Sequence, residues 1–250
     1  MAKYLEGAEP FSFEGNDIGV VVLHGFTGST QSVRLLGQVL HQSYGFSVAG
    51  PCLAGHGTSP DDMAATTCLD WLASAEQALK SMAARKRKVF VTGLSMGGTL
   101  ALNLAARFPN LVAAVAPINS PVGILDGQLA DLVFDPNAPD RIPGIGSDIK
   151  AEGVTELAYA ELPVSCIREA FVLLAGTGDL LHRIKCPLLA VQSRVDHVVP
   201  PANGQRILST VSSDIVRALW LDNSFHVATL DNDRQLIADS IGSFFSEGSA

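Results

Sequence analysis

The sequence of 250 residues has no run of the roughly 18–20 apolar residues that a membrane-spanning helix requires. Its opening stretch, MAKYLEGAEPF, also lacks the apolar core of a secretory signal. Basic residues are few, since 17 Lys and Arg stand against 25 Asp and Glu and leave a net charge of -8. Nucleic acid requires a basic protein face and anionic lipid attracts one, so neither partner is favoured. We expect a soluble, cytoplasmic protein that does not bind nucleic acid.

Clustered positive charge occurs as RKRK at Arg85–Lys88, which we expect to be a solvated loop before a buried strand. Cysteine is scarce and forms no C-x-x-C motif. The four widely spaced cysteines are Cys52, Cys68, Cys166 and Cys186. This spacing argues against a cysteine-bound metal, and a chain of this length does not need a disulfide framework. We expect neither a metal nor an organic cofactor.

Short apolar runs alternate with segments of helical periodicity along the chain. The runs predict strands at residues 18–25, 45–51, 88–93, 111–118, 186–193 and 215–221. The helical segments are residues 32–42, 68–84, 96–108, 202–208 and 234–245. Continuously apolar strands that alternate with helices predict an α/β fold, a mostly parallel sheet with helices on both faces. PFSFEG, residues 10–15, is expected to be an antiparallel edge strand.

Residues 120–185 are too long for a simple connection between two strands. They contain a helical pattern of their own at residues 166–176, with several large apolar side chains. We interpret this stretch as a small cap inserted at the carboxyl edge of the sheet, where open α/β sheets bind ligands. The length and the 47% hydrophobic content then fit a single domain, residues 1–250, with one cap insertion.

The stretch VFVTGLSMGGTL places one serine among glycines where a strand meets a helix. Such a pattern is consistent with a simple turn. It is also the pattern of a nucleophile elbow, G-x-S-x-G, in which Gly93 and Gly97 leave space for a strained Ser95. A nucleophilic serine needs a histidine, an acid and an oxyanion hole, so the elbow hypothesis predicts all three elsewhere in the sequence.

The histidine should follow Ser95 and the acid, because one known order of the triad is serine, then aspartate or glutamate, then histidine. Among six histidines, only His226 lies in a loop just after the last predicted strand. Asp196 lies three residues beyond the penultimate strand and is the expected acid. Its neighbour His197 should point elsewhere, since adjacent residues seldom project to one side.

Two further aspartates, Asp231 and Asp233, follow His226 and are expected to cap the final helix.

The oxyanion hole requires two backbone N–H groups directed at the developing negative charge. One is expected from Met96, which follows the serine at a helix N-terminus whose dipole favours an anion. The second is expected from Phe26, in the HGFTGS loop after the first buried strand. His24 in the same loop is interpreted as a structural residue that orients the turn.

Taken together, HGFTG, GHGTSP, GLSMGG, DHVVP and HVATLD resemble the bacterial monoacylglycerol lipase and carboxylesterase group of the α/β-hydrolase superfamily. The resemblance is greatest to the enzymes of thermophilic Bacillus and extends into the insertion, at IGSDIK and TELAYAELP. It implies Ser95, Asp196 and His226 as the catalytic triad, and Phe26 and Met96 as the oxyanion pair.

The resemblance also implies two substrate-binding residues in the insertion. Ile145 matches an isoleucine that gates substrate entry in this group. Glu156 matches a glutamate that contacts the glycerol hydroxyls, whereas its residue pattern alone favours a solvated helix glutamate. An apolar surface on the insertion is expected to make transient lipid contact.

These features predict a serine hydrolase that cleaves carboxylic esters, in particular monoacylglycerols, and that is a monomer or weak dimer. A carboxylesterase of broad specificity is the main alternative. A thioesterase or acyltransferase would use the same triad. A non-catalytic ligand receptor on the same fold would be expected to lack a triad member, whereas Ser95, Asp196 and His226 are all present.

Overall fold

A seven-stranded sheet organises the chain, described here by a computed structural model for residues 3–123 and 127–249. In spatial order its strands are β1 (Phe11–Phe13), β3 (Ser47–Gly50), β2 (Ile18–Leu23), β4 (Lys88–Leu94), β5 (Val112–Ile118), β8 (Leu188–Ser193) and β9 (Val216–Leu221). β1 runs antiparallel to β3, and every other neighbouring pair in this sheet is parallel. The predicted parallel sheet with one antiparallel edge strand is confirmed.

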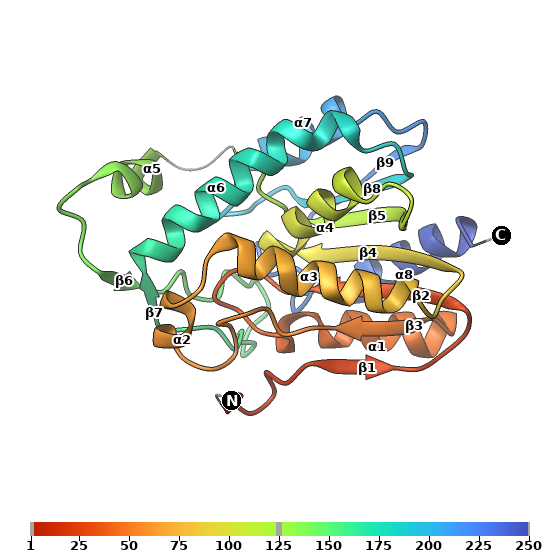
Figure 1. The fold of residues 1–250 in the computed structure, drawn as a ribbon, viewed down its shortest axis with the longest axis horizontal. Helices are drawn as coiled ribbons and strands as arrows, with labels where there is room; N and C mark the ends of the chain where they lie inside the picture. Colours follow the sequence, from red (N-terminus) through yellow and green to blue (C-terminus); the bar gives the residue numbers. More distant parts are fainter. Residues whose placement is uncertain (1–2, 124–126, 250) are drawn as a thin grey trace.

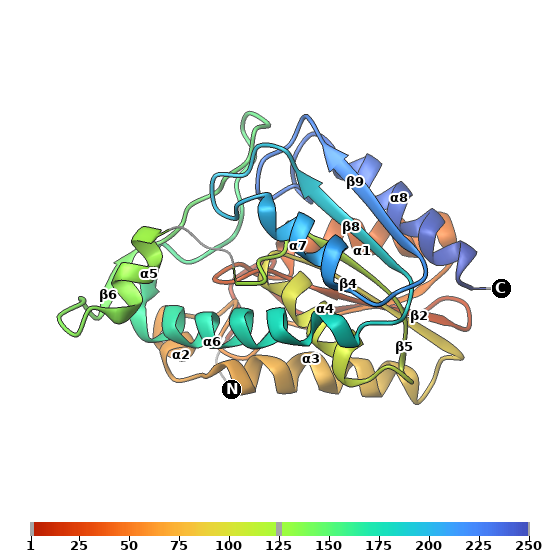
Figure 2. The ribbon, with the colours of Figure 1, turned by 90° about the horizontal axis from the view of Figure 1, so that it is seen from above.

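Helices cover both faces of the sheet, as Figures 1 and 2 show. One face carries α1 (Gln31–Tyr44) and α8 (Arg234–Glu247), and the other carries α3 (Cys68–Ala83), α4 (Met96–Arg107), α6 (Val164–Leu180) and α7 (Ala202–Thr210). Alternate residues of β2 serve the two layers: Val20 packs with α1 and α8, whereas Val21 packs with the opposite layer. Both faces are therefore buried, which explains why the strands are continuously apolar.

The helix that follows the candidate nucleophile is buried over most of its length. α4 carries small residues where it meets the sheet, and its residues from Met96 to Ala106 are all buried. It packs between the sheet and the neighbouring helices α3 and α6. A helix enclosed in this way cannot shift easily, so the residue at its start has a fixed position.

The first part of the segment between β5 and β8 lies at the carboxyl end of the parallel strands, on the left in Figure 1, and its last helix runs back from there along the helix layer. Its elements are α5 (Gly127–Phe134), the hairpin of β6 (Arg141–Pro143) and β7 (Glu161–Pro163), α6 and the short η1 (Leu181–Arg183). The helix predicted at residues 166–176 is present and extends over Val164–Leu180. The β6–β7 hairpin, α5 and a short helix α2 (Pro60–Ala64) were not predicted, and residues 124–126 of the insertion lie outside the described residues.

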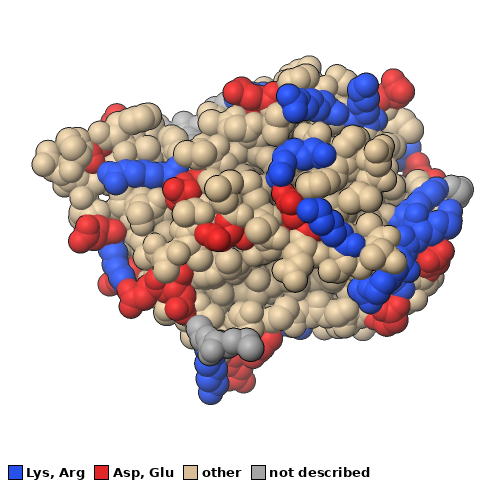
Figure 3. Space-filling model, viewed as in Figure 1, with Lys and Arg blue, Asp and Glu red and all other residues tan. Residues whose placement is uncertain are grey.

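Surface charges of the two signs are interspersed on the face shown in Figure 3. The basic cluster follows this pattern, since Arg85 and Lys86 pair with Glu14 and Arg87 pairs with Asp17. Within the described part of the chain, no helix combines the length and apolar character needed to cross a membrane. All four cysteines are free thiols. Residues 3–123 and 127–249 also contain no group of three or more His, Cys, Asp or Glu side chains arranged to hold a metal.

Candidate active site

Ser95 occupies the sharp bend between β4 and α4. Its φ of 54° and ψ of -123° lie in a region that non-glycine residues rarely adopt, at a typical cost of about 1–3 kcal/mol. The flanking glycines make this bend possible. A Cβ on Gly97 would collide with the carbonyl oxygen of Leu23, and a Cβ on Gly93 would lie 2.5 Å from the Gly97 carbonyl carbon. The bend therefore holds the serine side chain away from the backbone at the carboxyl edge of the sheet.

Three predicted residues from distant parts of the chain form a continuous hydrogen-bonded line. His226 Nε2 lies 2.9 Å from Ser95 Oγ, and His226 Nδ1 lies 2.9 Å from Asp196 Oδ2. The side chains of His226 and Asp196 are 8% and 0% exposed. The second oxygen of Asp196 accepts the N–H groups of Val198 and Val199, at 3.0 and 2.7 Å. Asp196 is therefore fixed as an acceptor facing the ring.

His197 points away from this line, as expected from its adjacency to Asp196. Its ring Nδ1 lies 2.8 Å from Asp148 Oδ1, and its side chain is 59% exposed. It does not contact Ser95. Geometry therefore separates the two histidines, and only His226 reaches the serine.

His24 has the structural position that the sequence indicated. Its Nδ1–H donates to the Gly25 carbonyl at 2.9 Å, and its Nε2 accepts the Leu53 N–H at 3.0 Å. Burial lowers the pKa of His24 to about 3, and the neighbouring His56 acts in the same direction. The neutral His24 ring therefore connects the loop after β2 to the loop after β3 through hydrogen bonds of both its nitrogens.

The candidate oxyanion donors, Phe26 and Met96, line the same cavity as Ser95. Gly25 is so close that a Cβ there would be 3.4 Å from Ser95 Cβ. The Gly25 carbonyl and the Phe26 N–H belong to one peptide unit and point in opposite directions, so the bond from His24 to that carbonyl also fixes the direction of the N–H. In residues 3–123 and 127–249, neither the Phe26 nor the Met96 N–H finds an acceptor.

Asn119 is a site residue that the sequence reasoning missed. It follows β5 directly, is buried and has a φ of 46°. Its amide group donates to the His226 carbonyl at 2.8 Å and to Ser193 Oγ at 3.0 Å, while its oxygen accepts the Ser193 N–H at 2.7 Å. Asn119 therefore connects the loop that carries His226 to β8 of the sheet through hydrogen bonds. A polar residue at the end of a buried strand was the only available signal.

The expected capping of α8 by Asp231 is wrong. The Asp231 carboxylate is buried and accepts the backbone N–H groups of Lys150, Ala151 and Phe225, at 2.7, 2.9 and 2.8 Å. It joins the insertion to the loop of the histidine, where a buried carboxylate is stabilised by several donors. Asp233 does occupy the N-cap position, but its side chain forms no capping bond and accepts instead from the loop after β9.

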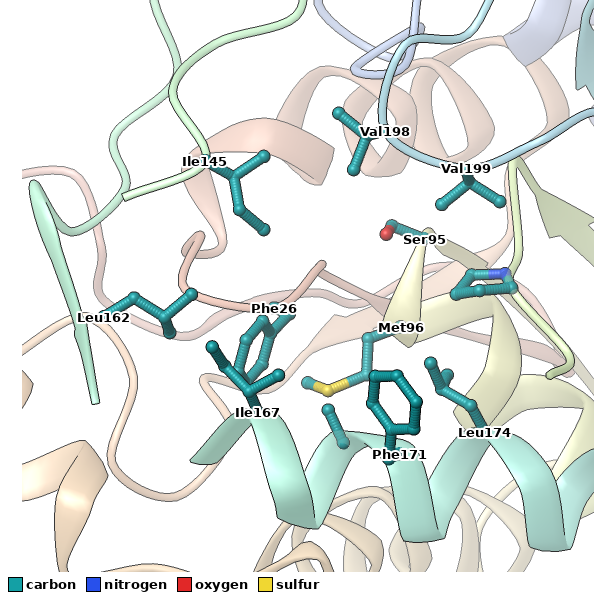
Figure 4. Close-up of a pocket in the computed structure, with 12 residues that line it drawn as sticks. Phe26, Ser95, Met96, Ile145, Leu162, Ile167, Phe171, Leu174, Val198 and Val199 are labelled. Carbon is teal, nitrogen blue, oxygen red and sulfur yellow. The ribbon is translucent and has the colours of Figure 1, made fainter. Parts of the chain in front are cut away.

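Two cavities meet at Ser95. The first, shown in Figure 4, has a volume of about 70 Å³ and is almost entirely apolar. Its lining residues are Phe26, Ser95, Met96, Pro121, Ile145, Leu162, Ile167, Ala170, Phe171, Leu174, Val198 and Val199. More than half of these residues come from the insertion. The second, of about 30 Å³, is lined by Ser95, His226 and Glu156 among others, and Ile145 borders both cavities.

Glu156 is the acidic side chain that lines the smaller cavity. It is partly buried, and loss of hydration raises its pKa to about 7, although His226 and a hydrogen bond with Ser32 act to lower the pKa. Near neutral pH its carboxyl group is therefore present in both protonation states and is able to donate as well as accept. Its backbone N–H donates to Ser147 Oγ at 2.9 Å. The alternative interpretation of Glu156, a solvated helix glutamate, is not observed, since this segment is neither helical nor fully exposed.

A strained serine at the carboxyl edge of a parallel sheet, joined through histidine to aspartate, defines the class of α/β serine hydrolases.

Comparison with known proteins agrees with this class. The family described as the alpha/beta hydrolase fold matches residues 19–144. A thermostable monoacylglycerol lipase of Bacillus sp. (strain H-257) is 42% identical over 97% of this chain and 96% of its own. A carboxylesterase of Bacillus subtilis (strain 168) is 27% identical, over 96% of each chain. A solved structure from work on LipS and LipT, two metagenome-derived lipolytic enzymes, has a TM-score of 0.95 and 48% identity, covering 98% of this chain and 100% of that one.

The chain belongs to the α/β-hydrolase family, within its bacterial monoacylglycerol lipase and carboxylesterase group. It is accordingly a carboxylic ester hydrolase.

Proposed function

We propose that this enzyme hydrolyses monoacylglycerols to fatty acid and glycerol. The observation that carries the proposal is the meeting of two unlike cavities at Ser95, one apolar and one containing a carboxyl group. A monoacylglycerol has the same division, since an acyl chain and a hydroxyl-bearing alcohol flank its ester bond. The name of the Bacillus relative, a monoacylglycerol lipase, supports the same substrate.

In the proposed reaction, Ser95 Oγ attacks the ester carbonyl while His226 Nε2, 2.9 Å away, removes the proton. Asp196 holds the ring in the tautomer with a proton on Nδ1 and stabilises the imidazolium that forms. His226 then returns the proton to the departing alcohol, which leaves an acyl group on Ser95. Water, activated by the same histidine, hydrolyses this acyl-enzyme.

The tetrahedral oxyanion is proposed to form between the N–H groups of Phe26 and Met96. Both groups lack an acceptor within the described residues, and Met96 lies at the N-terminus of α4, where the helix dipole favours negative charge. Loss of one such donor costs about 3–4 kcal/mol in related chemistry. The backbone geometry set by the glycines and His24 is thus part of the proposed catalytic apparatus.

For substrate binding, we propose that the acyl chain occupies the apolar cavity and the glycerol hydroxyls contact Glu156. Ile145 borders both cavities and is 47% exposed, a position suited to controlling entry. A site that binds hydroxyls discriminates against esters without them, because its own polar groups are then left unpaired. Glu156 would therefore favour monoacylglycerols over simple alkyl esters.

The test is a comparison of 1- and 2-monoacylglycerols of medium chain length, triacylglycerols and p-nitrophenyl esters. We expect hydrolysis of both monoacylglycerols, substantial activity on p-nitrophenyl esters and weak action on triacylglycerols. Glu156→Ala should lower kcat/KM for monoacylglycerols more than for p-nitrophenyl esters, whereas the matched change Glu152→Ala, at an exposed glutamate nearby, should alter neither. Equal losses on both substrates would leave a carboxylesterase of broad specificity.

We also propose transient lipid contact through the insertion, which acts as a cap over Ser95. Among the described residues of the insertion, three large apolar side chains are well exposed: Phe134 at 79%, Val172 at 63% and Ile145 at 47%. Sedimentation of the enzyme with neutral phosphatidylcholine vesicles would measure this contact, and loss of binding in Phe134→Ser would locate it. A monomeric or weakly dimeric state and a cytoplasmic location stay predictions of the sequence.

A further inference from the structure

Asp148 comes from the insertion but contacts both loops that carry the proposed acid and base. Its Oδ2 accepts the backbone N–H of His226 and the backbone N–H of His197, each at 3.1 Å. Its Oδ1 lies 2.8 Å from the ring nitrogen Nδ1 of His197, and its own carbonyl accepts the Val227 N–H at 3.0 Å. The Asp148 side chain is only 15% exposed. One partly buried carboxylate therefore joins the residue after Asp196 to the base itself.

The backbone of His226 is consequently held on both sides. Asp148 accepts its N–H, and Asn119 donates to its carbonyl at 2.8 Å. Asn119 directly follows β5 of the sheet, whereas Asp148 belongs to the insertion. The backbone of the base is therefore hydrogen-bonded to both parts of the molecule. Hydrogen bonds to a charged carboxylate are about twice as strong as those between neutral groups, and the Asp148 contact is of that kind.

The same short stretch of the insertion borders the substrate cavities. Ile145, three residues before Asp148, lines both of them. Ser147, directly before Asp148, accepts the Glu156 N–H at 2.9 Å. Residues 145–148 thus contact the proposed substrate cavities at one end and the acid and base loops at the other.

We infer that Asp148 is a positioning residue, through which the insertion sets the distance and orientation between Asp196 and His226. It lines neither of the two cavities at Ser95 and acts through the two backbone N–H groups. The inference rests on the proposed roles of Ser95, Asp196 and His226. Because every ester uses the same base, loss of Asp148 should impair turnover of all esters alike, whereas loss of a substrate-binding group would impair only some.

The experiment compares Asp148→Ala, Asp148→Asn and the control Glu152→Gln, which changes an exposed carboxylate four residues further along. Active sites are counted by labelling to completion with a serine-directed phosphonate, and kcat is expressed per labelled site. The substrates are p-nitrophenyl acetate and a medium-chain 1-monoacylglycerol. Thermal unfolding is recorded in parallel, since a purely structural residue would lower the melting temperature and the labelled fraction but not the kcat of labelled sites.

Asp148→Ala is expected to lower kcat on both esters by about tenfold to a hundredfold, the loss associated with a small misplacement of a reacting group, with KM within about threefold. Asp148→Asn keeps an oxygen that accepts both N–H groups in weaker, neutral bonds, so its loss should be about threefold to tenfold. Glu152→Gln should match the wild type. The rate of phosphonate labelling should fall in parallel with kcat, because it requires the same base.

Wild-type kcat per labelled site in the Asp148 variants would overturn the inference, as would a loss confined to the monoacylglycerol. If Asp148→Ala does not fold, Asp148→Asn decides alone, and an unchanged kcat in that variant refutes the positioning role. Ser95→Ala distinguishes a failure of the proposed function from a failure of the positioning role of Asp148. Turnover by Ser95→Ala would refute the proposed function itself. If Ser95→Ala is inactive and the Asp148 variants keep the wild-type kcat per labelled site, only the inference about Asp148 is refuted.

Discussion

Replacement of Glu156 by glutamine should stabilise the folded enzyme at neutral and alkaline pH. The carboxyl group of Glu156 has its pKa raised from 4.5 to about 7, chiefly because it is removed from water in the folded state. Charging this group in the cavity therefore opposes folding. Glutamine has nearly the same shape and cannot ionise, so it removes this cost while it also alters the proposed glycerol contact.

The magnitude follows from the difference in pKa between the folded and unfolded chains. One unit corresponds to about 1.4 kcal/mol, so a rise from 4.5 to about 7 is worth on the order of 3 kcal/mol. Between these two values the folded chain binds more protons than the unfolded chain, and the free energy of unfolding falls as pH rises. The stability present below about pH 4.5 is lost as pH increases through about 7, and no further change from this group follows above that value.

The assay is urea unfolding of the wild type and Glu156→Gln at pH 4.5 and pH 8. The two proteins should have similar free energies of unfolding at pH 4.5, and the variant should be more stable at pH 8 by up to about 3 kcal/mol. Glu152→Gln, at an exposed position, should show no difference that depends on pH. An equal effect of Glu156→Gln at both pH values would refute the reasoning, because the carboxyl group would then not be desolvated.

Three further predictions concern the nucleophile, its bend and the apolar cavity. Ser95→Ala should remove turnover and phosphonate labelling while the fold is retained, and Asp196→Asn should lower kcat on the order of 10⁴-fold through the wrong histidine tautomer; full activity in either would contradict the triad. Gly97→Ala should reduce the free energy of unfolding by about 1–3 kcal/mol or more, measured in urea, whereas Gly176→Ala, with no atom within 4 Å of the added Cβ, should not. Phe171→Ala should enlarge the apolar cavity and move the optimum of kcat/KM for p-nitrophenyl esters to longer acyl chains; an unchanged optimum would exclude this cavity as the acyl site.

Local patterns in the sequence were sufficient for the sheet and for the line of Ser95, His226 and Asp196. A strand buried on both faces must be continuously apolar, and the groups that follow such strands lie at one edge of the sheet. Each of the three residues follows a predicted strand, so its place in the chain was enough to locate it. The position of Phe26, after the first buried strand, was found by the same rule.

The residues that fix the positions of the triad loops cannot be recognised from a local sequence pattern. Asn119, Asp148 and Asp231 each bind backbone groups far away in the sequence, and the residue type alone does not identify these partners. Asp231 was assigned to the nearest helix end, because aspartate is common there, but a distant segment of the insertion supplies its donors. The β6–β7 hairpin was missed for a related reason: its strands have three residues each, too few to show a period.

The order of strands has a consequence for how the enzyme is assembled. β1 to β5 pair among themselves, whereas β8 pairs with β5 and follows residues 119–187, later in the chain than all five of these strands. The amino-terminal part of a chain is synthesised first, so β8 and β9 are expected to dock last. Ser95 follows β4 in the first part of the chain, whereas Asp196 follows β8 and His226 follows β9.

Ester hydrolysis should therefore reappear during refolding no earlier than the docking of β8 and β9. The fluorescence of the two tryptophans reports separately on the two parts of the sheet, since Trp71 is buried on α3 and Trp220 lies on β9. In variants that keep one tryptophan each, the fluorescence of Trp71 should recover before activity does, and the fluorescence of Trp220 should recover together with it.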